Sequence, residues 1–319
     1  MPDAIKTTAQ DETAQRQDSL APSDVQDTAP VAGKPRSLGA DAWRDLRRKP
    51  QFVVSAALIL LFLVISAFPT LFTSASPSLG ELAKTLQKPE LGHIGQADWF
   101  GYDLQGRSVY ARVIHGTRNS ILVGVGVTLL VTLFGGLLGM LAGYFGGIWD
   151  SLLSRITDVF FGIPFLLGAM VVLNAFAERS VWVVMGALAF LGWTQIARVM
   201  RGAVITTKHS DYVVAAKALG ADTKRILFRH ILPNAIAPVI VVATISLGVY
   251  IVAESTLSYL GMGLPSDSLS WGGDISDASN QIRNSPHTLL FPAGMLSITV
   301  LAFIMLGDAV REALDPKLR

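Results

Sequence analysis

The side chains that most often perform chemistry are few in this chain of 319 residues, and their spacing does not build an enzyme site. Cysteine is absent, which excludes disulfides, thiolate metal sites and cysteine nucleophiles. The pattern G-x-x-x-x-G-K-[ST] is missing, because the one Gly-Lys pair is Gly33-Lys34 in a polar segment. The histidines are scattered without metal-ligand spacing: His93, His115, His209, His230 and His287. We therefore expect a protein that has no catalytic residue and binds no metal or cofactor itself.

Four polar side chains lie within or next to long apolar segments and are candidate functional residues. They are Asn174, Thr194, Gln195 and Glu254. Buried polar groups in membrane helices are often functional. Hydrogen bonds between helices would explain the three neutral side chains equally well.

The apolar segments themselves predict an all-α membrane protein. Only 16% of the residues are charged, whereas a soluble protein carries roughly 25%. Each of six charge-free runs approaches the ~20 residues that a helix needs to cross the hydrocarbon core. The runs cover about 52–72, 120–145, 159–177, 181–197, 234–253 and 288–307. We predict six transmembrane helices within a membrane domain of residues 41–319.

The distribution of Lys and Arg predicts the orientation of these helices. With the N-terminus inside, the cytoplasmic segments hold 19 of the 26 Lys and Arg residues. The positive-inside rule then places both termini in the cytoplasm. The formal net charge of +2 is too small to favour a nucleic-acid partner.

Residues 1–40 are rich in Ala, Asp, Gln, Thr and Pro and contain no aromatic residue. Such a segment cannot bury enough apolar surface to offset the entropy of ordering. We predict a disordered cytoplasmic tail, with a regulatory role as the alternative.

Four glycines recur at steps of four along the second apolar run and just after it: Gly135, Gly139, Gly143 and Gly147. This spacing puts small residues on one helix face, which lets another backbone approach closely. We predict a helix-packing surface; a pore lining would be the alternative.

Residues 211–233, on the predicted cytoplasmic side, read as two short helices. Asp211 can cap the first and Gly220 can end it, while Asp222 can cap the second and Pro233 can end it. The apolar face expected on the first helix consists of Tyr212, Val213, Ala216 and Leu219. Such a basic loop could dock to a partner protein or lie on anionic lipid, and the physical pattern favours neither.

The same segment resembles the signature loop of ABC-importer permeases, which reads Glu-Ala-Ala, three residues, Gly, nine residues and Ile-x-Leu-Pro. The residues at matching spacing are Ala215, Ala216, Gly220, Leu232 and Pro233. Val214 stands where the family has Glu, and His230 where it often has Ile. The resemblance implies an ATPase-coupling loop whose contact residues are Tyr212, Ala215, Ala216, Gly220, Ile231, Leu232 and Pro233.

Further motifs make residues 40–319 similar to the dipeptide/oligopeptide/nickel permeases, and most similar to the C-type subunit. The matching stretches are Phe100-Gly101-Tyr102-Asp103 with Gly106-Arg107-Ser108, Gly116-x-Arg118-x-Ser120, Arg155-x-x-Asp158 with Ile163-Pro164, Glu254-Ser255-x-Leu257-Ser258-Tyr259-Leu260-Gly261, and Leu306-Gly307-Asp308 with Leu314-Asp315-Pro316. Tyr102 and Ser108 replace the usual Thr and Asp.

The resemblance implies a type I ABC-importer permease fold in the bacterial plasma membrane. It also makes the four polar residues named above candidates for the translocation path: Asn174, Thr194, Gln195 and Glu254. The partners of such a permease would be a homologous B-type permease, two ATPase subunits that bind ATP and Mg, an external substrate-binding protein, a short peptide and the lipid bilayer. Nickel chelates or haem-like cargo are alternatives within the family. An ATP-independent secondary carrier would normally hold an ionisable group or a broken helix at mid-membrane, and the six runs contain no ionisable residue. A membrane anchor or scaffold is the remaining class.

Overall fold

The computed structural model describes residues 46–265 and 267–314, so the predicted tail of residues 1–40 lies outside the described part. Five helices are long and apolar enough to cross a bilayer, and a bent helix pair adds up to one more. The five are α3 (Pro50–Ala67), α4 (Val109–Phe145), α7 (Val181–Thr207), α10 (Leu232–Tyr259) and α12 (His287–Leu314). The described residues contain no β-strand beyond one isolated bridge between Tyr102 and Ser108. The prediction of an all-α membrane protein is confirmed.

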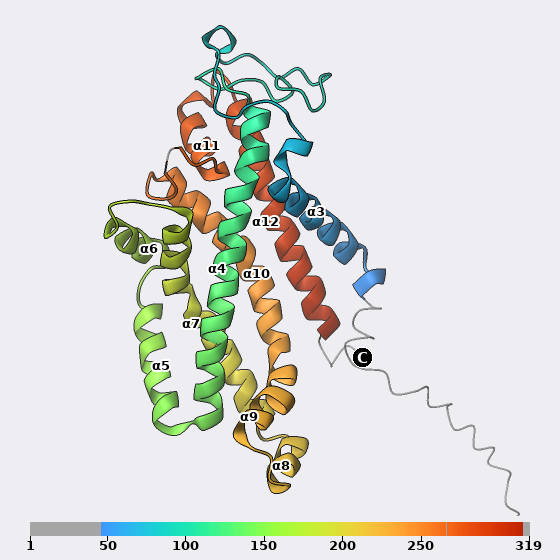
Figure 1. Ribbon diagram of the computed structural model, residues 1–319, viewed down its shortest axis with the longest axis vertical. Coiled ribbons are helices and arrows are strands. Elements are labelled where there is room, and N and C mark those ends of the chain that lie inside the picture. Colours follow the sequence, from blue (N-terminus) through green and yellow to red (C-terminus); the bar gives the residue numbers. More distant parts are fainter. Residues whose placement is uncertain (1–45, 266, 315–319) are drawn as a thin grey trace, which may run out of the picture. The chain divides into compact units, whose positions relative to one another are not determined.

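Shorter elements connect these helices (Figure 1). The bent pair is α5 (Gly147–Phe161) and α6 (Phe165–Asn174). The remaining elements are η1 (Pro69–Leu71), η2 (Leu82–Lys84), α8 (Asp211–Ala218), α9 (Thr223–Arg225), the π-helical turn η3 (Ile226–Ile231), α11 (Trp271–Ala278) and η4 (Ser279–Gln281).

Four of the five long helices extend beyond the charge-free runs that predicted them, whereas α3 ends at Ala67, before the end of the 52–72 run. α4 begins at Val109 rather than near residue 120, because the Ser108 hydroxyl caps it by accepting from the Ala111 N–H (3.1 Å). α7 continues to Thr207, past two arginines that pair with carboxylates on α5. The charge-free runs therefore identified the apolar middle of these four helices. They missed the helix ends, which caps and ion pairs stabilise.

The third predicted span, residues 159–177, is wrong as a single helix. α5 ends at Phe161 and α6 begins at Phe165, and their axes differ by 88°. Pro164 stands at the N-cap of α6 with extended ψ (120°). A proline has no N–H to donate and clashes with the preceding helical turn, so it ends α5 and starts α6.

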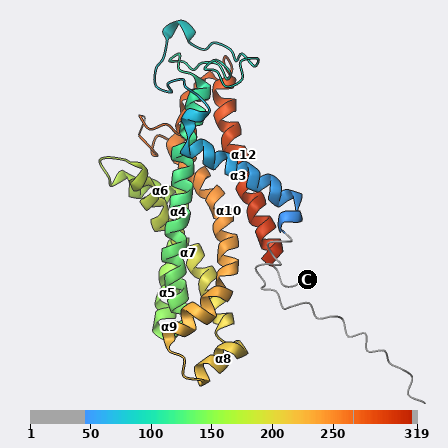
Figure 2. The same ribbon diagram turned by 45° about the vertical axis from the view of Figure 1, so that its right-hand side comes forward.

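α4 and α7 lie side by side over most of their lengths and form the centre of the bundle (Figures 1 and 2). α10 packs against both of them and against α12, while α3 packs on α12 and α4. An ion pair between Lys49 and Glu312 (2.6 Å) joins the start of α3 to the end of α12.

Three of the four glycines predicted as a packing face contact α7. A Cβ at Gly135 or Gly139 would overlap the carbonyl oxygen of Trp193 or Ala197, and one at Gly143 would lie 2.9 Å from the Arg201 oxygen. Gly147 does not belong to this face, contrary to the prediction. α4 ends at Phe145, and Gly147 is an exposed residue with φ +57° that begins α5. The chain turns there in a conformation that glycine adopts readily.

Figures 1 and 2 show the two ends of the described helices. α8 and α9 lie at one end, beyond the ends of α3 and α12, and the long segment of residues 73–108 lies at the other. The loop of residues 211–233 and this segment are thus separated by the length of α4.

Candidate translocation cleft, coupling loop and outer ion network

A cleft of about 430 Å³ opens beside the break between α5 and α6. The break supplies Phe160, Phe161 and Phe165, and α10 supplies Tyr250, so the walls are largely aromatic. Tyr250 approaches Gly192 of α7, where its hydroxyl lies 3.4 Å from the carbonyl oxygen. None of the residues that line the cleft is charged.

The structure brings two of the four candidate route residues together and separates the other two. Thr194 and Gln195 of α7 both line the cleft. Asn174 is the exposed last residue of α6 and does not line it.

Glu254 is enclosed away from the cleft in the part of α10 that packs near α11, with no exposed surface. Its carboxylate accepts hydrogen bonds from Ser258 (2.8 Å), Ser255 (3.3 Å) and Ser120 on α4 (3.4 Å). Ser120 in turn accepts from the backbone N–H of Trp271 (3.3 Å). A buried carboxylate requires such partners, and these tie α10 to α4 and α11. Glu254 therefore acts here in packing the helices.

The first half of the 211–233 loop has the predicted form with two differences. Gly220 follows α8 with φ +80°, the left-handed conformation expected at the end of a helix. Asp211 does not cap α8; Ser210 occupies the cap position and Asp211 is the first helical residue. On α8 the buried apolar residue is Val213, whereas Tyr212 and Leu219 are exposed (45% and 89%). Ala215 is exposed and Ala216 half-buried.

The second half of the loop joins directly onto α10. Asp222 caps α9 as predicted and accepts from the Arg225 N–H (3.2 Å). Pro233 does not end the second helix, contrary to the prediction, because η3 widens the turn and Pro233 falls in the first turn of α10. A proline costs no hydrogen bond there. The side-chain amide of Asn234 donates to the His230 carbonyl oxygen (2.8 Å) within the same turn.

The placement of the remaining loop residues gives the loop an anchored side and a free side. Ile226, Leu227 and Ile231 are buried in the cluster that also contains α4 and α7 residues, and Leu232 packs against it. The exposed apolar side chains are Tyr212, Val214, Leu219 and Phe228. A projecting surface of this kind is typical of an interaction site.

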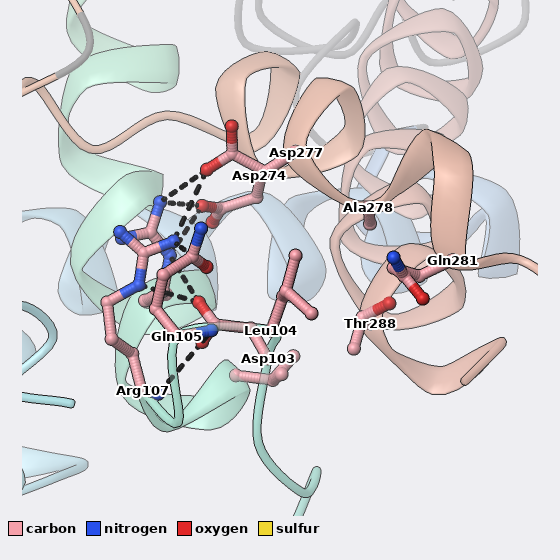
Figure 3. Close-up of a pocket in the computed structure, with 11 residues that line it drawn as sticks. Asp103, Leu104, Gln105, Arg107, Asp274, Asp277, Ala278, Gln281 and Thr288 are labelled. Atoms are coloured by element: carbon pink, nitrogen blue, oxygen red, sulfur yellow. Dashed lines mark hydrogen bonds and ion pairs between the residues drawn. The ribbon is translucent and has the colours of Figure 1, made fainter. Parts of the chain in front are cut away.

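A buried ion network at the opposite end was missed by the sequence analysis (Figure 3). Arg112 on α4 donates to Asp274 on α11 through Nε (2.7 Å) and through Nη2, and both residues are 7% exposed. Arg107 pairs with Asp103 (2.6 Å) and reaches Asp277 (3.3 Å). The network therefore ties the 73–108 segment to α4 and α11. The Ser108 cap was the signal that could have placed Arg112 one turn inside a helix.

The environment of Asp274 is electrostatically unusual. Burial raises the pKa of its carboxyl to about 6, although the Arg112 guanidinium acts in the opposite direction. The adjoining pocket has room for about 20 Å³, roughly one water molecule. Figure 3 shows the charged side chains on one side of it and Ala278, Gln281 and Thr288 on the other. This pocket is too small for a peptide.

Comparison with known proteins decides the family. Residues 135–319 match the binding-protein-dependent transport system inner membrane component, and residues 37–89 match the N-terminal transmembrane domain of oligopeptide transport permease C. The chain belongs to the binding-protein-dependent transport permeases. This confirms the ABC-importer permease resemblance, and the permease is a multi-pass protein of the bacterial inner membrane.

Similar permeases cover nearly the whole chain. The oligopeptide transport system permease protein OppC of Bacillus subtilis is 35% identical over 94% of this chain and 96% of its own. The dipeptide transport system permease protein DppC of the same organism is 38% identical, with 88% and 86% covered. The glutathione transport system permease protein GsiD of Pectobacterium atrosepticum is 33% identical, with 87% and 92% covered.

Proposed function

We propose that this permease is the C-type transmembrane subunit of an ATP-driven importer of short peptides. The observation that carries the proposal is its 35% and 38% identity to oligopeptide and dipeptide permeases over most of the chain. Similarity to a glutathione permease fits the same class of cargo, since glutathione is itself a tripeptide. The chain performs no covalent chemistry in this proposal.

The partners follow from the architecture of such importers. A homologous B-type permease would complete the translocation path, and an external binding protein would deliver the peptide. Two ATPase subunits would bind ATP and Mg, so the permease itself needs no cofactor. With both termini in the cytoplasm, as the Lys and Arg distribution predicts, the 211–233 loop faces the ATPases.

The loop is proposed to dock to the ATPase rather than to lie on lipid. It lies beyond the ends of α3 and α12 (Figures 1 and 2), and its exposed apolar residues Tyr212, Leu219 and Phe228 have a free surface. ATP binding would then favour one arrangement of the helices, because it stabilises one state of the docked ATPases over the other.

The test is uptake of a labelled dipeptide and tripeptide by vesicles that contain the complete transporter and its binding protein. We expect uptake that requires ATP on the ATPase side and that stops when ATP is replaced by a non-hydrolysable analogue. Uptake at an equal rate without ATP, driven by a proton or sodium gradient, would favour a secondary carrier. Uptake of nickel or haem in place of peptide would correct the cargo alone.

A further inference from the structure

The two polar side chains of the cleft have no protein partner, although neighbouring side chains of the same kind do. Thr117, Thr128 and Thr244 each donate to the carbonyl oxygen one helical turn earlier (2.8–2.9 Å). Within the described part of the chain, neither Thr194 nor Gln195 makes a side-chain hydrogen bond. Thr194 is nevertheless only 4% exposed. Its hydroxyl oxygen is not one of the buried polar atoms that lack a partner, so it is accessible from the cleft that Thr194 lines and is free to pair with a group bound there.

The surroundings of these two residues resemble those of substrate sites in transporters. The cleft lies at a broken helix, where α5 and α6 meet at 88°. Irregular backbone at membrane depth is tolerated where it lines a cavity, and such breaks commonly bind substrate. Gln195 is exposed towards this cleft rather than paired within the bundle, and an amide facing lipid would be unfavourable.

The chemistry of the lining fits an uncharged group with one donor and one acceptor. Phe160, Phe161, Phe165 and Tyr250 provide apolar walls. A charged pair in contact with one wall is exposed: Arg198 stacks on Phe161 (4.0 Å) and lies 3.4 Å from Asp158. A glutamine amide donates and accepts, as a threonine hydroxyl does, and a peptide group offers the complementary N–H and C=O.

We propose that Thr194 and Gln195 bind the main-chain amide of the transported peptide, so that the permease recognises the peptide bond and not the charge of the side chains. This inference rests on the proposed peptide import and adds a subsite to it. The aromatic walls accept side chains of different size without a fixed hydrogen bond, which suits cargo of varied sequence.

The test couples a change in the protein to a change in the substrate. Two labelled peptides are compared: tri-alanine, and tri-alanine that is N-methylated at its central residue. We measure their uptake by the full transporter assembled with the original permease, with Thr194→Val or with Gln195→Leu. The matched control is Thr206→Val on the same helix, whose hydroxyl bonds to its own helix at Gly202 (3.2 Å). The preference of the binding protein for one peptide over the other is the same for all four permeases, so it cancels when their uptake ratios are compared.

We expect the original permease to favour the unmethylated peptide in kcat/KM, and Thr194→Val and Gln195→Leu to reduce that preference by about tenfold, the effect of one hydrogen bond. Thr206→Val keeps the original preference, and Thr194→Ser restores it. Thr194→Val preserves side-chain shape, so it carries the test if Gln195→Leu fails to assemble.

An unchanged preference in Thr194→Val would overturn the subsite while leaving peptide import intact. Absence of peptide uptake by the original transporter would instead refute the proposed function, and the subsite with it.

Discussion

Removal of the Arg112 guanidinium is expected to destabilise the permease through Asp274. Arg112→Met keeps the long side chain but leaves the Asp274 carboxylate, which is 7% exposed, without its principal partner. The second oxygen of Asp274, Oδ2, already lacks a hydrogen-bond partner among the described residues. Breaking a buried pair in this way costs about 3–5 kcal/mol. Among the nearby charges, Asp277 disfavours ionised Asp274, and Arg107, which is itself paired with Asp103 and Asp277, favours it.

The pH dependence of this loss follows from the pKa of Asp274. That pKa is raised from 3.8 to about 6 in the folded protein, so ionisation favours unfolding as pH rises from about 4 to 6 and removes about 3 kcal/mol. Above pH 6 the original protein loses no more stability through this group. In Arg112→Met the pKa of Asp274 rises further, so stability keeps falling above pH 6. The two stability curves should run parallel below pH 6, and above it the gap between them should widen by at most about 1.4 kcal/mol per pH unit.

The assay is the unfolding temperature of the purified complex between pH 5 and 8, followed by tryptophan fluorescence. The comparison set is Arg112→Met, Asp274→Asn and the double variant. Because the two residues form one pair, the double variant should be less destabilised than the sum of the single variants. Additive losses, or an Arg112→Met loss independent of pH, would refute the claim that the pair holds α4 to α11.

The remaining predictions concern packing, coupling, topology and motion. Gly139→Ala should prevent assembly or sharply reduce the amount of complex. Gly136→Ala should be tolerated, because its added Cβ would lie 3.8 Å from Met200. Equal yields of the two variants would show that close contact with α7 is unimportant. Gly220→Glu and Ala216→Glu should leave the subunit inserted but abolish ATPase pull-down and uptake, while Val214→Glu, the family's usual residue, should retain both; normal binding by the first two would remove the docking role of the loop. A reporter after Arg319 should be active only in the cytoplasm and one near Leu86 only outside, and the reverse at either site would overturn the topology. In this cysteine-free chain, Phe165→Cys with Tyr250→Cys, whose rings are 6.1 Å apart, should cross-link to an extent that changes when ATP is added; an ATP-independent yield would argue against a cleft that changes width.

Sequence patterns predicted the features that depend on local composition. Apolar length predicted the five long helices but not the break between α5 and α6, four-residue spacing predicted the contacts of Gly135, Gly139 and Gly143, and Gly220 has the left-handed backbone expected of it. These features can be predicted without knowing which segments of the chain meet in space. The exception is the helix that the glycines contact, α7, which the spacing does not identify.

Features that depend on long-range partners could not be predicted in the same way. Arg112 and Asp274 are 162 positions apart, and nothing in either neighbourhood identifies the other. Glu254 seemed a route residue because it follows an apolar run, yet three serines enclose it. Pro233 was expected to end a helix, but a π-helical turn before it lets the chain enter α10. The errors at Arg112, Asp274 and Glu254 came from reading a residue without the segment that packs against it, and the error at Pro233 came from a local irregularity of the helix.

The chain connectivity links the proposed docking loop to the cleft mechanically. α7, which carries Thr194 and Gln195, enters the loop, and α10, which carries Tyr250, leaves it. Ile226, Leu227 and Ile231 fix the loop to the same apolar cluster as these two helices. The third wall of the cleft, the α5–α6 break, is not continuous with the loop along the chain, although Ala169 and Leu173 of α6 belong to the same cluster. A displacement of α8 by a docked ATPase would therefore reach the cleft through α7 and α10, because packed helices move as units rather than deform continuously. The widened η3 turn lies where α10 leaves the loop, which is where such a displacement would enter the helix.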